Sequence, residues 1–281
     1  MQINNHRLTG VAFDASPNIS GMLNPQYIVM HYTAGWEGGS AINTLCSPAA
    51  KVSAHLVIDR DGTITQLVPF NRVAWHAGPS KFDGKDGMNN YSIGIEMVNI
   101  GYLREKPGVP GVYQLSTGSA WKDVPAKRLE GLDLSIKAAN KRIGGGTYIW
   151  PAYTKAQIDA AKEAVKAIVA TYKIKDITTH EIIDKRGWKT DPGPAFPMGE
   201  FKAVIHIGNA RNDSLAAKGT FVVTAAALNV RKEPNVNSPI VAILHKGDNV
   251  AVEKDLGDWS YVEYEPGKFG YLTDKFIAQA A

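Results

Sequence analysis

Three metal-ligating side chains stand where the local sequence is able to hold them rigidly. His31 lies near the end of the apolar run 27–32, and His180 lies at the end of another short run. Asp191 follows soon after, directly before a Pro-Gly-Pro sequence that stiffens the backbone. Two imidazoles and one carboxylate would leave the fourth corner of a tetrahedral zinc site open to water, which is the arrangement that metal-dependent hydrolysis requires.

The spacing of these three residues leaves a second interpretation open. The chain contains seven histidines, so triplets arise easily by chance. A histidine in an apolar strand, such as His31, is also often a hydrogen-bonded core residue. A choice between the two interpretations needs further motifs.

Apolar patterning predicts the elements that must position these side chains. Short, nearly continuous apolar runs predict buried strands, one of which carries Glu96 near its end. The Asp-Gly pair at 61–62, between two such runs, indicates a hairpin. The predicted strands are 27–32, 55–58, 63–68, 92–98 and a return segment at 174–179.

Helices are predicted in the second part of the same region. Thr154 and Gln157 have the form of a capping box before a one-sided apolar pattern. A further helix is predicted over 126–142, although Gly131 weakens it. The Gly- and Pro-punctuated stretch 101–125 indicates a long surface loop of the kind that borders active sites. Strands followed by helices predict an α/β fold with a mixed central sheet flanked by helices.

The length of 281 residues allows one full-sized domain and a smaller one. The composition changes near Ala203, beyond which small and polar residues precede short apolar runs separated by turns. We therefore expect a catalytic domain over 1–203, a linker over 204–218 and a small all-β barrel over 219–281.

Charge and targeting signals exclude few functions. The net charge is +4: residues 219–281 carry six Lys+Arg against eight Asp+Glu, which is −2, and the remainder carries +6. The basic part suits an anionic polymer, yet an ordinary solvated surface explains it equally well, and no nucleic-acid-binding motif is present.

The sequence also lacks the patterns of membrane and disulfide-bonded proteins. No apolar run approaches the roughly 20 residues that span a bilayer, and the first residues lack a secretory pattern. We therefore expect synthesis in the cytoplasm without a signal peptide, and no stable membrane insertion. The single Cys46 excludes an internal disulfide.

Five motifs occur in one order along the chain and favour the metal-site interpretation. They lie at 31–35, 53–62, 74–78, 90–96 and 189–196. Together they resemble the AmpD-type N-acetylmuramoyl-L-alanine amidases of the amidase-2 family, which is also similar to phage amidase lysozymes and peptidoglycan recognition proteins. The resemblance covers about residues 20–200 and implies the mixed α/β fold of that family.

The resemblance implies roles for individual residues. It places a zinc cofactor on His31, His180 and Asp191, and it makes Glu96 and Lys189 the catalytic pair. Amide chemistry agrees, because Glu96 would transfer a proton from water to the leaving amine, and Lys189 would neutralise the developing oxyanion. The alternatives are a strand-end surface carboxylate and an ordinary surface lysine.

Residues near these motifs are further candidates. In the phage-lysozyme branch a tyrosine precedes the histidine that matches His55, whereas Ala54 stands here, so the chain resembles the branch with a glutamate base. We expect His55 close to the cleft, either structural or in contact with substrate. Trp75 and His76 are predicted to line a glycan groove, with core packing as the alternative for Trp75, and Asn99 is a candidate for binding peptide.

The C-terminal region carries a resemblance of its own. Residues 228–234, with Ser238 and later Gly and aromatic positions in order, are similar to bacterial SH3 domains over about 219–279. That resemblance implies cell-wall binding, which would raise the local concentration of scissile bonds around a tethered amidase. Trp259 and Tyr261 are candidate wall contacts, or else core aromatics of the barrel. The net charge of −2 argues against simple electrostatic adhesion.

These observations predict a zinc-dependent hydrolase that cuts the amide bond between N-acetylmuramic acid and L-alanine in peptidoglycan. A wall-targeting barrel without a secretory signal favours a phage or prophage endolysin that acts on the wall after release. A bacterial autolysin or a secreted lytic effector with the same activity is the alternative. A peptidoglycan-recognition protein that has lost catalysis is a third hypothesis, against which all three ligand positions are filled.

Overall fold

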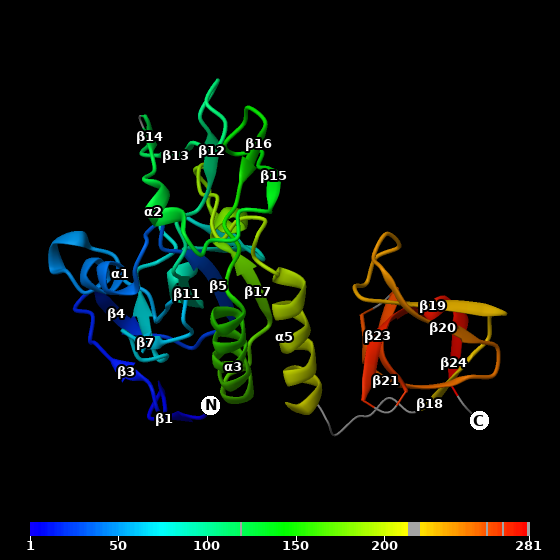
Figure 1. Cartoon of the computed structure of the whole chain (residues 1–281). Helices are drawn as coiled ribbons and strands as arrows, with labels where there is room; N and C mark the ends of the chain where they lie inside the picture. The colour runs from blue at the N-terminus through cyan, green and yellow to red at the C-terminus, as the bar shows by residue number, and fades with distance from the viewer. Residues whose placement is uncertain (119, 213–219, 257, 266, 280–281) are drawn as a thin grey trace. The chain divides into compact units, whose positions relative to one another are not determined.

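The computed structural model describes residues 1–118, 120–212, 220–256, 258–265 and 267–279. The chain forms two compact units, Met1–Ile205 and His206–Ala281 (Figure 1). Each unit has its own hydrophobic core. No helix within the described residues is long and apolar enough to cross a membrane.

A six-stranded mixed sheet forms the centre of the first unit. Four neighbouring strands run parallel, and the hairpin partner of the fourth runs antiparallel to it. Buried residues occupy almost every position of the parallel strands, which explains their continuous apolar sequence. The order is β17 (Asp176–Thr179), β5 (Tyr27–Tyr32), β11 (Ser92–Met97), β6 (Leu56–Ile58), β7 (Ile64–Gln66) and β3 (Ala12–Phe13).

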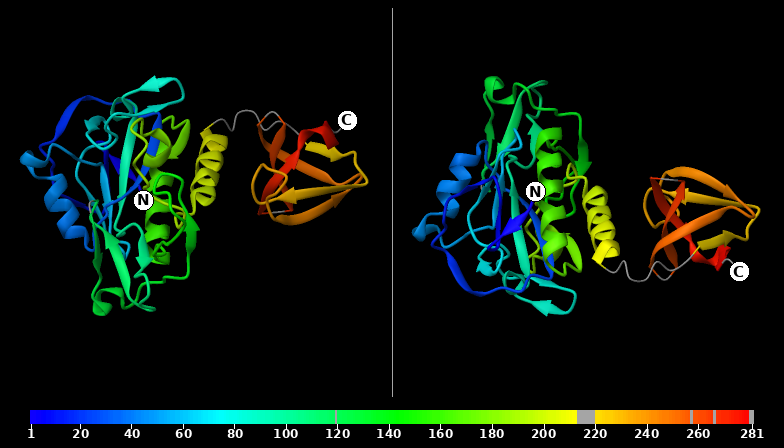
Figure 2. Two further views of the ribbon diagram at one scale, coloured as in Figure 1. Left: turned by 90° about the horizontal axis from the view of Figure 1, so that it is seen from above. Right: turned by 90° about the horizontal axis from the view of Figure 1, so that it is seen from below.

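Helices cover the two faces of this sheet unequally. Helices α3 (Lys155–Thr171) and α5 (Met198–Asn212) lie on the same side (Figure 2), where their apolar residues share one core with Met30 and Ile95. The predicted cap of α3 is present, because the Thr154 side chain accepts from the Gln157 N–H. On the other face, α1 (Gly38–Leu45) packs near β6.

The predicted linker over 204–218 differs from the structure in its first part. Helix α5 continues through Asn212, so residues 204–212 are helical. Phe201 and Ile205 are buried in the core and anchor the start of this helix, and adding further turns to an existing helix costs little. Residues 213–218 lie outside the described residues.

A second, antiparallel sheet occupies the stretch for which a loop and a helix are predicted. Among the described residues of this stretch, one helical turn forms, α2 (Ala126–Leu129). Gly131 adopts a φ of +74°, which a right-handed helix cannot contain, so the predicted helix over 126–142 is wrong. The strands, in order, are β14 (Trp121–Asp123), β13 (Tyr113–Ser116), β12 (Leu103–Glu105), β16 (Thr147–Ile149) and β15 (Lys137–Ala139).

Short elements complete the first unit. Three two-stranded ribbons join β1 (Ile3–Asn4) to β2 (Arg7–Leu8), β4 (Ile19–Met22) to β8 (Arg72–Ala74), and β9 (Lys81–Phe82) to β10 (Lys85–Asp86). The short helices are η1 (Pro48–Ala50), η2 (Met88–Asn90) and α4 (His180–Ile183).

The second unit is the expected small all-β barrel of the SH3 type. Its antiparallel strands enclose a core of small aliphatic residues, such as Val230, Val250 and Val262. The strand order is β20 (Ile240–His245), β19 (Ala227–Arg231), β23 (Lys268–Thr273), β22 (Trp259–Glu265), β21 (Asn249–Asp255), β18 (Thr220–Val223) and β24 (Ile277–Gln279), with η3 (Asp274–Phe276) before the last strand.

Gln157 ties α3 to the sheet and provides a test of this packing. Its fully buried Nε2 donates to the carbonyls of Ile58 and Val98 at 2.9 and 3.1 Å. We expect Gln157→Leu to lower the free energy of unfolding by about 1–3 kcal/mol, because both carbonyls lose a buried donor. Urea denaturation followed by tryptophan fluorescence measures this change. The control Lys155→Gln, on the exposed face of α3, should change stability by less than about 0.5 kcal/mol.

Candidate metal centre

Three neighbouring parallel strands bring the candidate residues together at their carboxyl ends. On β11 and β5, Glu96 is the direct register partner of His31. On β17, Thr179 pairs with Met30, so His180 follows at the level of His31. The carboxyl edge of parallel strands is where α/β folds usually place their ligands.

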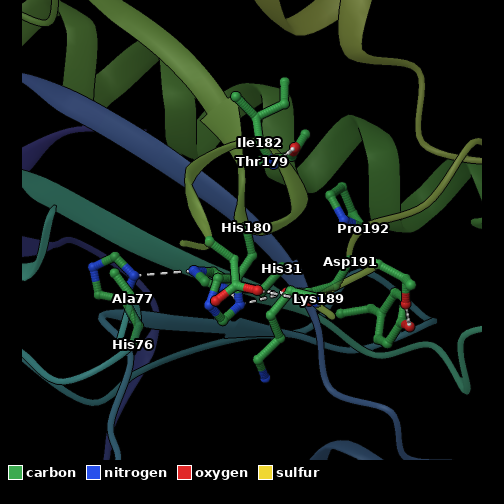
Figure 3. A network of polar contacts seen from close by, with 12 residues as sticks. His31, His76, Ala77, Thr179, His180, Ile182, Lys189, Asp191 and Pro192 are labelled. Carbon is green, nitrogen blue, oxygen red and sulfur yellow. Dashed lines mark hydrogen bonds and ion pairs between the residues drawn. The ribbon is translucent and has the colours of Figure 1, made fainter. Parts of the chain in front are cut away.

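The His31, His180 and Asp191 side chains point toward one another at this edge (Figure 3). The two Nδ1 atoms lie 3.0 Å apart, and Asp191 Oδ2 lies 3.0 Å from His31 Nδ1 and 2.9 Å from His180 Nδ1. All three residues are buried. A tetrahedral zinc ion with ligand distances of about 2.0–2.2 Å would space its ligands by roughly 3.3 Å, so the size of the cluster suits such an ion.

The protonation states of this cluster also fit a metal cation. Burial, together with the nearby His180, lowers the pKa of His31 to about 4, so the ring is neutral at neutral pH. Burial alone would raise the pKa of Asp191, but hydrogen bonds with His180 and His31 hold it well below its usual range. A neutral His31 ring and an ionised Asp191 carboxylate are in the deprotonated forms that metal binding requires.

His76 connects the far side of the His31 ring to the backbone. Its Nδ1 lies 3.0 Å from His31 Nε2, and its own Nε2 lies 3.3 Å from the Ser92 carbonyl oxygen. With His31 Nδ1 facing the metal position, His31 Nε2–H donates to His76, whose Nε2–H donates to Ser92. This chain of donors fixes the tautomer and orientation of His31.

Glu96 and Lys189 line the cleft that opens above the cluster, a cavity of about 710 Å³. One Glu96 carboxylate oxygen is buried, and no hydrogen-bond partner for it exists among the described residues. Burial and the negative charge of Asp191 raise the pKa of Glu96 to about 8, against the opposing charge of Lys189. Such a carboxyl group is able to exchange a proton near neutral pH.

Sequence comparisons agree with this geometry. Residues 21–194 match the family N-acetylmuramoyl-L-alanine amidase, and residues 226–278 match the bacterial SH3 domain. The chain belongs to the N-acetylmuramoyl-L-alanine amidase family. The family's match covers more than half of the chain and includes His31, His180 and Asp191 as well as His76, Glu96 and Lys189.

Individual relatives of this family member are moderately similar. The 1,6-anhydro-N-acetylmuramyl-L-alanine amidase AmpD of Citrobacter freundii is 32% identical over 202 residues, which is 65% of this chain and 81% of that protein. AmpD of Salmonella typhimurium is 31% identical over 57% of this chain, which spans 60% of that relative's length. A crystal structure of an AmpD derivative is 25% identical with a TM-score of 0.49, covering 73% of this chain and 99% of the other.

Two of the candidate substrate contacts have structural roles in this amidase-family chain, which for His55 was one of the two expectations. His55 is fully buried; its Nδ1 accepts from the Gly94 N–H and its Nε2 donates to the Arg72 carbonyl. Asn99 is buried too, and its amide bonds the backbone of Pro151 and Gly101. The polar atoms of both side chains are hydrogen-bonded to backbone groups, so neither side chain is free to meet a substrate.

The remaining predicted contacts differ in how accessible they are. Trp75 and His76 line the cleft, and their contact with substrate stays a prediction. In the barrel, Tyr261 is 6% exposed with its ring 4.9 Å from that of Tyr271, which agrees with the alternative that it is a core aromatic of the barrel. Trp259 is partly exposed, and its wall contact stays a prediction.

Asp184 is a residue of the site region that the sequence did not reveal. Its buried carboxylate accepts from Arg142 Nη1 at 3.2 Å, from Arg186 Nε at 2.9 Å, and from two backbone N–H groups of the loop that ends at Asp191. Burial alone would raise the pKa of Asp184, but these donors lower it to about 2. Arg186, two residues after Asp184, was a weak sign in the sequence of an ion pair at Asp184. Arg142 is distant in the sequence and gave no such sign.

Gly94 lets the His76 ring reach its place, which a substitution tests. A Cβ at Gly94 would lie 2.4 Å from His76 Cγ. We expect Gly94→Ala to displace His76 and, through His31, to weaken zinc binding by about 10–100-fold, measured by competition with a chelator.

Gly21→Ala is the matched control for that substitution, because nothing lies within 4 Å of its added Cβ. The control should bind zinc like the parent chain. Unchanged zinc affinity in Gly94→Ala would show that the His76 contact does not orient His31.

Asp184 makes a prediction about pH. Because its folded pKa of about 2 lies below the ordinary value of 3.8, its contribution is complete above about pH 5 and is lost as the pH falls toward 2. We expect Asp184→Asn to cost about 2 kcal/mol of unfolding free energy at pH 7 and about half of that at pH 3. Urea denaturation at several pH values measures the difference. A loss of unfolding free energy that is the same at pH 7 and pH 3 would contradict the assigned pKa. The control is Asp159→Asn, which breaks an exposed ion pair with Lys155 and should lower the unfolding free energy little at either pH.

Proposed function

We propose that this chain hydrolyses the amide bond between the lactyl group of N-acetylmuramic acid and the first L-alanine of the peptidoglycan stem. The observation that carries the proposal is the convergence of His31, His180 and Asp191 at the floor of a cleft that Glu96 also lines. Membership of the amidase family supports the same bond, as do the names of the relatives.

We infer that His31 Nδ1, His180 Nδ1 and Asp191 Oδ2 hold a zinc ion. The nitrogen and oxygen donor types and their spacing suit zinc. When bound, zinc supplies a Lewis acid that polarises an amide carbonyl and lowers the pKa of water to about 7. His76 then holds the His31 ring in the orientation that this role needs.

Glu96 is the proposed proton carrier. It stands next to His31 across the strand pair, so its carboxylate lies beside the position where the scissile carbonyl would rest. Its raised pKa suits a group that accepts a proton from the attacking water and passes it to the leaving nitrogen of L-alanine. Without that second transfer the amine would leave as a poor, unprotonated anion.

Lys189 is proposed to stabilise the oxyanion. It lines the cleft two residues before Asp191, and the hydrogen bond from its backbone N–H to Asp184 fixes its part of the loop. A fixed cation in a partly buried cleft stabilises developing negative charge more than a solvated one does.

The barrel supports a proposal about the biological role. A tethered wall-binding module would raise the effective concentration of a polymeric substrate, but it would add nothing for small soluble fragments. We therefore propose that the chain lyses intact cell wall, as a phage endolysin does; a bacterial autolysin or a secreted effector is the alternative. Comparing the lysis of phage-infected and of uninfected host cultures, each with and without this protein, distinguishes these roles.

Glu96→Gln separates the proton carrier from the metal ligands. We expect this variant to keep its zinc content by elemental analysis and to lose about 10²–10⁴-fold in rate, because the amide cannot accept the proton. His31→Ala should lose both zinc and activity. Digestion of purified sacculi followed by mass spectrometry measures the release of stem peptides that begin with L-alanine.

Glu130→Gln, an exposed carboxylate outside the cleft, is the control for that substitution and should keep full activity. A Glu96→Gln enzyme with a near-normal rate would remove the proposed base. Cross-bridge or glycan fragments in place of free stem peptides would reject the proposed bond.

A further inference from the structure

Three partly exposed aromatic rings gather on one face of the second sheet. The rings of Trp121 and Tyr148 are nearly parallel, with centroids 6.0 Å apart and an interplanar angle of 4°. The Tyr102 ring lies 5.9 Å from that of Trp121 and 5.3 Å from that of Tyr148. We call these three rings the aromatic platform.

The platform is continuous with the cleft. Tyr102 belongs to the platform and also lines the cleft. Ser116 lines the cleft as well, and it is the direct register partner of Trp121 on the neighbouring strand, so the two side chains share one face. A chain-like ligand that leaves the cleft over Ser116 therefore meets Trp121 next.

The opposite face of the same sheet is already committed to packing. Leu103, Leu115 and Ile149 alternate with the platform residues along their strands and form a small core with Ile100 and Val124. The platform rings are thus not needed for that core. They are also held firmly, because Tyr102 contacts Trp150, whose ring lies against Gly193 beside Asp191.

Polar and charged side chains on the platform face are held by hydrogen bonds and by contact with the rings. Arg104 lies over the Trp121 ring at 4.2 Å and donates through Nε to Gln114 Oε1 at 2.9 Å. Asp123 accepts from Gln114 and from Lys106, each at 2.6 Å. Aromatic faces beside satisfied polar groups suit an uncharged, polyhydroxylated ligand, whose C–H faces stack on the rings.

We propose that the aromatic platform binds sugar rings of a glycan strand that extends from the cleft. The inference rests on the proposed function, which places a muramyl sugar in the cleft, and it names the substrate class as glycan polymer. Each added sugar contact is made away from the scissile bond, so the platform favours intact wall over single-sugar fragments.

Substrate length provides the test. We expect Trp121→Ala to lower kcat/KM on purified sacculi by about fivefold to tenfold. The same variant should cleave a soluble anhydro-N-acetylmuramyl tripeptide, which has one sugar, like the parent chain. Trp121→Phe, which keeps an aromatic ring, should recover most of the activity lost on sacculi. The control is Lys122→Ala, at the next position of β14 and on the opposite face of the sheet, which should match the parent chain on both substrates. Equal losses on both substrates, or no loss on sacculi, would overturn the proposal.

A binding measurement keeps the platform separate from the proposed amidase activity. Titration of the full chain with a β-1,4-linked N-acetylglucosamine hexamer should show a dissociation constant about fivefold to tenfold weaker for Trp121→Ala, with the barrel unchanged in both proteins. If neither substrate yields peptides that begin with L-alanine, the proposed function fails, but this titration still decides the platform. Equal binding by parent and variant, or no binding by the parent, would overturn it.

Discussion

The mutual approach of two imidazole nitrogens and one carboxylate oxygen, within 3.0 Å of one another and buried, is the constraint on which the site depends. Three such lone pairs repel unless a cation or a proton lies between them. Burial disfavours the protonated histidine, so a metal cation satisfies the cluster better. The fold must therefore hold three ligands from distant segments against their own repulsion.

The surrounding structure provides this rigidity in separate ways. Parallel pairing of β17, β5 and β11 fixes the positions of His180, His31 and Glu96 through backbone hydrogen bonds. His76 fills the space above Gly94 and holds the His31 ring from behind. Asp184 gathers the loop that delivers Asp191, for which no strand is available.

The second sheet ties this centre to a wider surface. Arg142, on the turn between β15 and β16, pairs with Asp184, and Trp150 packs on Gly193 next to a ligand. The sheet that carries the aromatic platform therefore also contacts the segment that holds a candidate metal ligand. Contacts made by a long substrate on that sheet lie on a rigid support, which keeps binding and positioning together.

Much of the fold was available from local pattern. Buried parallel strands appear as continuous apolar runs, and the α3 helix shows both its cap and its apolar face, because these signals depend on neighbours a few residues apart. The loop and helix predicted over 101–142 are wrong, since the strands there are three or four residues long and β12 pairs with β16, which is distant in sequence. Short strands form because they pair with other strands, and local periodicity in the sequence does not show that pairing.

The sequence by itself determined the amidase family and the residue types of the site, because five motifs in order leave few other families. Only the tertiary structure decided which polar residues are free for chemistry. His55 and Asn99 have the types expected of substrate contacts, yet the fold uses their polar atoms to hold backbone. Asp184 and the aromatic platform arise from residues that the chain brings together only on folding, since hydrogen bonds and ring contacts depend on distances in space that no spacing along the chain records.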